Sequence, residues 1–152
     1  MALGPMLGQG KGERSMSILI RVATGALLML LALTATAGQR HGLDEVQAAY
    51  AAAVRWNDFE TAWEIVDPAY RLAHPQSDLQ RERYQQVQIS GYREVRTSAG
   101  AENEVLRDVE LRVINRNTQA ERVVRTRETW RWDPDGKQWW LASGLPDLWR
   151  GE

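Results

Sequence analysis

The stretch ETWRWDPDGKQWWLAS (residues 128–143) predicts a β-hairpin and with it the fold class of this chain. Apolar and polar residues alternate on both sides of its centre, as they do in two paired antiparallel strands. Pro134 suits the second position of a type I turn, and Gly136 suits the left-handed position that follows it. A loop of this kind pairs Asp133 with Lys137 and sets the register of the whole hairpin.

This register distributes the tryptophans of the hairpin over two faces of the sheet. Three facing pairs are expected on one face: Trp132 with Gln138, Trp130 with Trp140, and Glu128 with Ala142. On the opposite face, Arg131 is expected to lie against Trp139 in a cation–π contact. A carboxylate among indoles is unfavourable unless a cation accompanies it, so the preceding strand should supply one.

Charge patterning predicts the register of that preceding strand. The segments NEVLRDVELRVIN (103–115) and ERVVRTRETWRW (121–132) both alternate between apolar and polar residues. Opposite charges favour three facing pairs: Asp108 with Arg127, Glu110 with Arg125, and Arg107 with Glu128. The first two pairs fall on the outer face, where each stabilises by only about 0.2–1 kcal/mol. The third falls on the tryptophan face and supplies the cation.

The residues before the strands show helical periodicity. Apolar residues recur every three or four positions in LDEVQAAYAAAVRW (43–56), which indicates an amphipathic helix. Asp58 is a suitable N-cap for a short second helix, which Asp67 and Pro68 are expected to end. The segment SDLQRERY (77–84) predicts one or two further helical turns.

The period then changes to two, and Gly91 predicts a bulge in a long first strand. Helices followed by about four antiparallel strands define an α+β fold with N-terminal helices packed on the sheet. Residues 38–152 are expected to form this single domain. Its C-terminal tail, residues 144–152, is expected to pack back through its apolar side chains.

The N-terminal residues have the pattern of a secretory signal peptide. Basic residues precede the uncharged run VATGALLMLLALTATA (22–37), which ends in a small-x-small cleavage site. We therefore expect residues 1–37 to be a signal peptide, with Met16 as an alternative start and the domain in the periplasm or outside the cell. If cleavage fails, residues 22–37 would anchor the protein in the inner membrane.

The composition excludes several classes of protein. The chain has 19 Lys and Arg against 20 Asp and Glu, a net charge of −1, which argues against nucleic-acid binding. It has no cysteine, so no disulfide can form. Its two histidines lack the spacing of metal ligands, and no phosphate-binding glycine loop follows the signal segment. We expect no metal and no cofactor.

The order of these elements resembles the NTF2-like superfamily, which includes SnoaL-like cyclases, ketosteroid isomerase, scytalone dehydratase and limonene epoxide hydrolase. The resemblance covers residues 43–145. It rests on RWNDFETAWEIV (55–66) as a helix–break–helix and RETWRWDPDGKQWWLASGL (127–145) as the last hairpin. It implies a curved sheet that forms a cone with a pocket on its concave face, and dimers that pair through the outer sheet face.

The catalytic patterns of that superfamily are not reproduced. Tyr50 and Tyr92 are available to accompany a carboxylate base, but the sequence places neither opposite Glu128. The acid–arginine–acid arrangement of the epoxide hydrolases requires an acid two residues from Arg107, where valines stand on both sides. His74 lies in a loop-like segment and is expected to be a surface histidine.

Two sets of candidate residues follow. The pocket-lining candidates are Glu128, Arg107, Trp130, Trp132, Trp140, Tyr50 and Trp63. The outer-face interface candidates are Arg125, Arg127, Arg131 and Trp139. The pair of Glu128 and Arg107 is either a structural ion pair or the polar anchor of a ligand.

The expected function is that of an exported, non-catalytic domain that binds a small apolar ligand or a partner in the cell envelope. One alternative is an isomerase, dehydratase or hydrolase that acts on a small hydrophobic substrate. Another is an assembly module whose homodimer is the functional unit. An unpaired Glu128 beside an open cavity would favour the enzyme, and a locked ion pair would favour the other two readings.

Overall fold

The computed structural model describes Met1 and residues 39–149. From His41 onward, these residues belong to one compact unit. The predicted signal peptide (1–37) and the alternative anchor (22–37) lie outside the described residues, apart from Met1. Within the described part of the chain, no helix is both long enough and apolar enough to cross a membrane.

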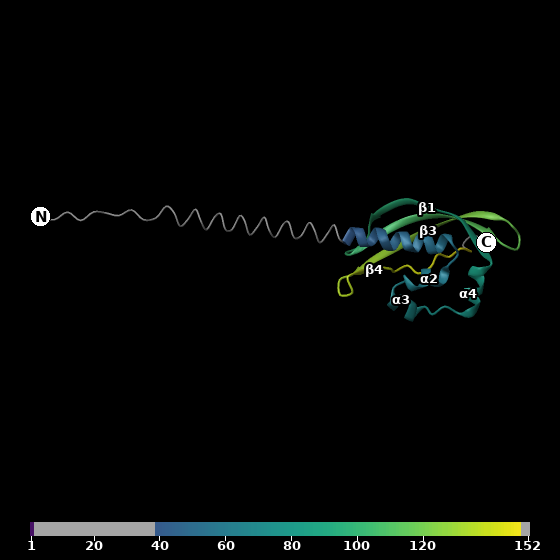
Figure 1. Cartoon of the computed structure of the whole chain (residues 1–152), viewed down its shortest axis with the longest axis horizontal. Coiled ribbons are helices and arrows are strands. Elements are labelled where there is room, and N and C mark those ends of the chain that lie inside the picture. The colour runs from purple at the N-terminus through teal and green to yellow at the C-terminus, as the bar shows by residue number, and fades with distance from the viewer. Residues whose placement is uncertain (2–38, 150–152) are drawn as a thin grey trace. The chain divides into compact units, whose positions relative to one another are not determined.

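Helices come first in the described chain. They span 39–55, Phe59–Glu64 (α2), Pro68–Ala73 (α3) and Asp78–Gln85 (α4). The predicted caps Asp58 and Ser77 are confirmed, since each side chain accepts a hydrogen bond from a backbone N–H in the first turn of its helix. Figure 1 shows α2, α3 and α4 together on one side of the sheet.

The strands form one antiparallel sheet in the order β1-β2-β3-β4. They span Val87–Ala99 (β1), Glu104–Asn115 (β2), Glu121–Asp133 (β3) and Gln138–Leu141 (β4). The sheet is curved but unclosed, and Figure 1 shows the bend in its long strands. The predicted α+β class is therefore confirmed. The bulge predicted at Gly91 is also present, because the register of β1 shifts between Ile89 and Gly91.

The end of the second helix differs from the prediction. Helix α2 stops at Glu64, and Val66 then forms a parallel bridge to Leu141 at the open edge of β4. The Asp67 N–H donates to the Leu141 carbonyl at 2.9 Å. The Asp67 carboxylate caps α3 by accepting from the Ala69 N–H at 2.8 Å. Asp67 therefore starts a helix that the sequence did not predict.

The core lies between the concave face of the sheet and the first helix. Tyr50 and Trp130, both fully buried, meet there edge to face with ring centroids 5.6 Å apart. Leu148 is also fully buried, and the Arg122 guanidinium donates to its carbonyl. The described part of the predicted C-terminal tail therefore packs back on the domain as expected.

The predicted register of β2 and β3 is confirmed. Asp108 pairs with Arg127, Glu110 with Arg125, and Arg107 with Glu128. Each of these pairs is also an ion pair. Alternating charge thus specified both the register and the face of each side chain, as the pleat of a strand requires.

The predicted register of β3 and β4 is wrong by one residue. Asp133 pairs with Gln138, so the loop contains four residues rather than three. The left-handed residue is Lys137, with φ of 51°, and not Gly136. The Asp133 Oδ1 atom accepts from the N–H groups of Asp135 and Gly136 at 3.1 and 3.2 Å, which closes the longer loop.

This shift exchanges the faces of two tryptophans. Trp130 pairs with Leu141 instead of Trp140. Trp139 pairs with Trp132 on the inner face and is buried, so its predicted place on the outer face is wrong. Trp140 instead faces Arg131 on the outer side, which removes it from the predicted pocket lining. A one-residue slip moves every side chain of a strand to the other face.

Candidate functional site

Glu128, the acid that the sequence predicted to be buried beside an arginine, lies in a closed hydrogen-bond network. Its Oε2 atom accepts from the Arg107 Nε at 2.8 Å and from the Trp130 indole at 3.0 Å. Its Oε1 atom accepts from the Tyr92 hydroxyl at 2.5 Å. The Arg107 guanidinium also donates to that hydroxyl at 2.6 Å. Glu128 and Arg107 are only 4% and 5% exposed.

In this network, both carboxylate oxygens of Glu128 accept hydrogen bonds. Three donors on three strands hold the carboxylate, and the arginine balances its charge where water has little access. Burial, together with the neighbouring Glu128, raises the pKa of Tyr92 well above its ordinary value, so the phenol remains a neutral donor. A general base needs a lone pair directed at a substrate, and here both oxygens are engaged within the protein.

The other pocket-lining candidates are dispersed. Tyr50 and Trp130 are core residues without exposed surface to offer a ligand. Trp132 is partly buried and contacts Trp139, with ring centroids 5.5 Å apart. Trp63 lines an open cleft. Whether any of these residues binds a ligand stays a prediction.

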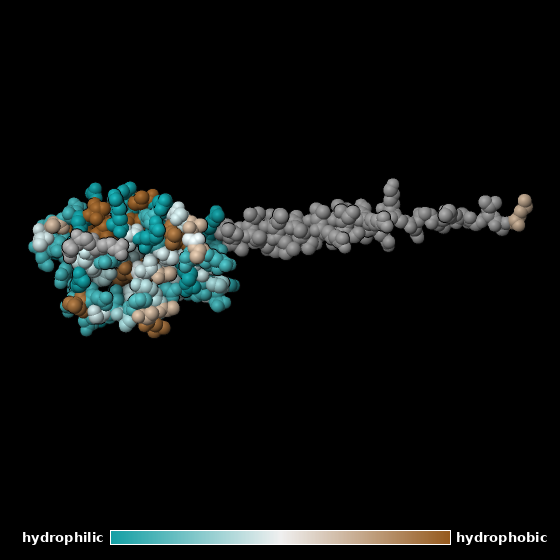
Figure 2. Space-filling view, turned by 180° about the vertical axis from the view of Figure 1, so that it is seen from behind, coloured by the Kyte–Doolittle hydropathy of each residue, from teal (hydrophilic) through white to brown (hydrophobic). Residues whose placement is uncertain are grey.

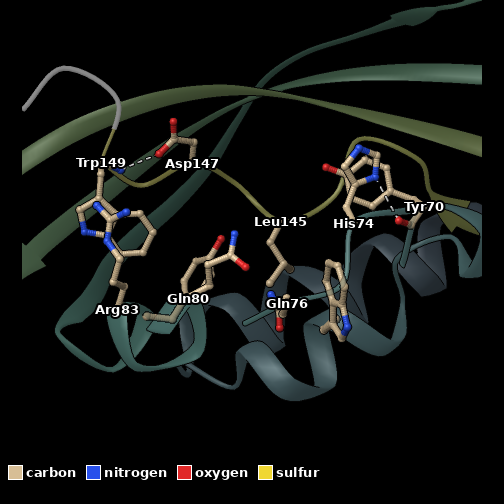
Figure 3. A pocket seen from close by; sticks show the side chains of 10 residues that line it. Tyr70, His74, Gln76, Gln80, Arg83, Leu145, Asp147 and Trp149 are labelled. Atoms are coloured by element: carbon tan, nitrogen blue, oxygen red, sulfur yellow. Dashed lines mark hydrogen bonds between the residues drawn. The ribbon is translucent and has the colours of Figure 1, made fainter. Parts of the chain in front are cut away.

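That cleft lies between the helical lobe α3–α4 and the C-terminal segment, residues 142–149 (Figure 3). Its volume is about 220 Å³. It is lined by aromatic, amide and charged side chains: Trp63, Tyr70, His74, Gln76, Gln80, Arg83, Tyr84, Leu145, Asp147 and Trp149. In Figure 3, Trp149 and Arg83 stand at one end, Tyr70 and His74 at the other, and Leu145 lies between them.

One end of the cleft is built around Tyr84. Its ring packs on Phe59 with centroids 4.4 Å apart and meets the Trp149 ring at 5.0 Å. Its hydroxyl donates to the Pro146 carbonyl at 3.0 Å, which ties α4 to the C-terminal segment. The Arg83 guanidinium lies 4.3 Å from the centroid of the Trp149 ring, a cation–π distance.

The other end is built around Tyr70. Its ring meets Trp63 at 6.4 Å and stacks on His74 at 4.3 Å. Gly144 makes this arrangement possible, because a Cβ atom there would lie 2.5 Å from the Tyr70 ring. Gly144 also has φ of 73°, a conformation that glycine adopts without strain. A side chain at this position would displace Tyr70 from the wall of the cleft.

Sequence reasoning missed most of this cleft. Of its lining, Trp63 was among the candidates, and His74 was considered only as a surface histidine. The remaining residues come from α3, α4 and the loop between them, and from the C-terminal segment, which is distant from them in the sequence and shares no periodicity with them. The aromatic residues of YRLAHPQ (70–76) and of the tail were the available signal. No group of three metal-binding side chains occurs in the part of the chain that the structure describes.

Comparison with known proteins shows no family for this chain. No protein-family model matches it, and no curated protein matches it. A solved structure that does match is the solution structure of a SEC-C motif containing protein from Rhodopseudomonas palustris. It shares 19% sequence identity at a TM-score of 0.49, over 62% of this chain and 70% of the other.

The predicted resemblance to the NTF2-like superfamily is wrong. No family model links the chain to that superfamily, and the solved structure reported above is described as a SEC-C motif protein. The described sheet also stays open instead of closing into a cone, and buried side chains fill its concave face. Different α+β folds share the order of helices followed by a meander of strands. This order alone therefore does not identify a superfamily.

Proposed function

We propose that this chain is a non-catalytic binding domain that holds a small aromatic anion in the cleft between α3–α4 and the C-terminal segment. The observation that carries the proposal is the lining of that cleft. Two tryptophans, two tyrosines and an arginine border an open space, whereas both oxygens of the buried carboxylate already accept hydrogen bonds within the protein. A pocket with aromatic walls and a few polar groups is the usual form of a small-molecule site.

The size of the cleft argues for a ligand of one ring. A cavity of about 150 Å³ accommodates benzene, while drug-sized ligands occupy about 300–1,000 Å³. The cleft, at about 220 Å³, falls between these limits. Trp63 and Tyr70 offer ring faces and edges against which an aromatic ligand can pack, at a gain of about 0.5–1.5 kcal/mol beyond simple burial.

The polar groups of the cleft argue for an anionic substituent. Arg83 presents a guanidinium at one end, and the amides of Gln76 and Gln80 lie along the wall. A guanidinium pairs well with a carboxylate because two parallel N–H groups match its two oxygens. Asp147 also lines the cleft, and it disfavours a second negative charge on the ligand.

Benzoate tests the proposal directly, by titration against the tryptophan fluorescence of the purified protein. We expect a dissociation constant of about 0.1–1 mM, as suits a ligand of this size. Trp149→Leu should weaken binding by about tenfold or more, and Arg83→Gln should weaken binding of benzoate but not of benzamide. Cyclohexanecarboxylate, which has the charge without the ring, should bind several-fold more weakly than benzoate.

The matched control is Trp56→Leu, because Trp56 is 86% exposed and lies outside the cleft. That variant should bind benzoate like the parent protein. Equal loss in both tryptophan variants, or full binding by Trp149→Leu, would exclude the cleft. Loss of binding only when Glu128 or Tyr92 is replaced would move the site to the buried network.

A further inference from the structure

The outer face of the sheet carries two rows of charge that run across three strands. Each row places an acid of β2 between an arginine of β1 and an arginine of β3. The rows are Arg93–Glu110–Arg125 and Arg96–Asp108–Arg127. The distances between charged atoms are 2.9 and 3.3 Å in the first row and 2.9 and 2.6 Å in the second. We call these six residues the arginine face.

The acids of this face are recessed and the arginines stand outward. The side chains of Glu110 and Asp108 are 17% and 27% exposed, respectively. The four arginine side chains are 54–82% exposed. A partner approaching the sheet would therefore meet guanidinium groups first, and the carboxylates beneath would hold those groups in place.

The charge of this face is opposite in sign to that of the whole chain. Four arginines stand over two acids, whereas the chain as a whole carries a net charge of −1. Each acid is shared by two arginines, so each row keeps one positive charge for an external anion. Arginines with an imposed orientation lose less side-chain entropy on binding than free ones do.

Exposed apolar side chains border the arginine face. Val123 lies two residues before Arg125 on β3, shares its face, and is 53% exposed. Val95 on β1 is 54% exposed. Figure 2 shows hydrophobic side chains among hydrophilic ones along the side of the domain where Figure 1 places the sheet. A protein segment can use apolar contacts of this kind, whereas a phosphate polymer cannot.

We propose that the arginine face docks an acidic, extended segment of a partner protein, with carboxylates at every second position. Side chains two residues apart on an extended strand lie about 6.6–6.8 Å apart, which is the separation of the two rows. One acid of the partner would then meet each row, and an apolar residue two positions beyond the acids, on the same side of the partner strand, would reach Val123. A second copy of this chain would instead set one positive face against another.

The test is binding of a fluorescent peptide with glutamate at every second position to the purified protein, measured by anisotropy. The control peptide has the same composition with its glutamates contiguous, and it should bind several-fold more weakly. Arg125→Gln combined with Arg127→Gln should weaken binding by about tenfold or more, and the binding should fall as salt rises. Arg55→Gln combined with Arg81→Gln removes the same charge elsewhere and should have little effect.

A second variant separates lost binding from lost folding. Asp108→Asn combined with Glu110→Gln makes the arginine face more positive and should tighten binding of the alternating peptide at low salt. Equal loss in both arginine double variants would overturn the proposal, because charge alone would then explain binding. Tighter binding to polyphosphate or to vesicles of anionic lipid than to the peptide would overturn it too. So would a dimer, seen by native mass spectrometry, that the Arg125 and Arg127 changes dissociate.

Discussion

At the scale of single residues, Glu128 and Arg107 form the pair on which the core depends. Glu128→Gln keeps the shape of the side chain but leaves Arg107, 5% exposed, with the half-exposed Glu94 at 3.9 Å as its remaining carboxylate partner. We expect a loss of about 3–5 kcal/mol in the free energy of unfolding, the usual effect of breaking a buried ion pair. Urea denaturation followed by circular dichroism measures it.

Glu110→Gln is the matched control, since it makes the same chemical change on the outer face of β2. Its partners Arg93 and Arg125 are largely exposed, so solvent replaces the lost interaction and the loss should be much smaller. Equal losses for the two variants would show that burial of Glu128 does not matter. The core would then not depend on the pair of Glu128 and Arg107.

The sequence was sufficient to predict this pair, for a physical reason. Three charge pairs between β2 and β3 agree on one register. A slip by one residue would separate all three pairs and would bury the polar face of one strand. It was not sufficient to predict Tyr92 as the third member of the network. Tyr92 reaches Glu128 from β1, just after the bulge at Gly91. A bulge inserts one extra residue, so the alternation of residues along the strand no longer tells which face Tyr92 is on.

At the level of secondary structure, the turn residues of the β3–β4 hairpin do not by themselves determine its register. The letters DPDG fit a loop of three residues or of four, and the two differ by one step of register. The loop with four residues places Lys137 at φ of 51°, where a side chain is disfavoured. It also pairs Trp132 with Trp139 and Trp130 with Leu141 on the inner face, so packing selected the longer loop.

Lys137→Gly tests this register. Glycine adopts the left-handed conformation without strain, so we expect a gain of about 0.5–1 kcal/mol in the free energy of unfolding, measured by thermal denaturation. Gly136→Ala should instead destabilise, because its Cβ atom would lie 2.9 Å from the Asp133 carboxylate. A loss of stability in Lys137→Gly would indicate that Gly136, and not Lys137, is the left-handed residue, and that the register predicted from the sequence is correct.

Helix α4 was predicted, but helix α3 and the packing of both helices escaped prediction for another reason. Neither helix buries a residue, so no apolar stripe marks their packing. Tyr84 attaches α4 to the C-terminal segment through contacts distant in sequence. The cleft therefore arises from tertiary packing that periodicity does not record. Class and strand order followed from local pattern, whereas the candidate site did not.

At the scale of the whole molecule, the arginine face makes stability depend on acid pH. Hydrogen bonds from Arg127, and then from Arg96, hold the pKa of Asp108 at about 2, below its ordinary value of 3.8. Those from Arg93 and Arg125 lower the pKa of Glu110. A carboxyl with a lowered pKa stabilises the fold above its ordinary pKa, and this contribution is lost as pH falls toward the lowered value.

We therefore expect the melting temperature to fall between pH 3.8 and about 2, the interval over which Asp108 becomes protonated only in the unfolded chain. Asp108→Asn combined with Glu110→Gln removes both titrating groups and should make the decline shallower than in the parent protein. Calorimetry across this interval measures the difference. Parallel declines in the two proteins would contradict the assignment of these ion pairs to acid stability.

The cleft should bind a ligand, whereas the buried Glu128 should only stabilise the fold. The seven tryptophans report on this difference by nuclear magnetic resonance of their indole N–H groups during a benzoate titration. Binding of benzoate in the cleft should shift the signals of Trp63 and Trp149 but not that of Trp130, whose indole donates a hydrogen bond to Glu128. Shifts at Trp130 without shifts at Trp149 would contradict this expectation.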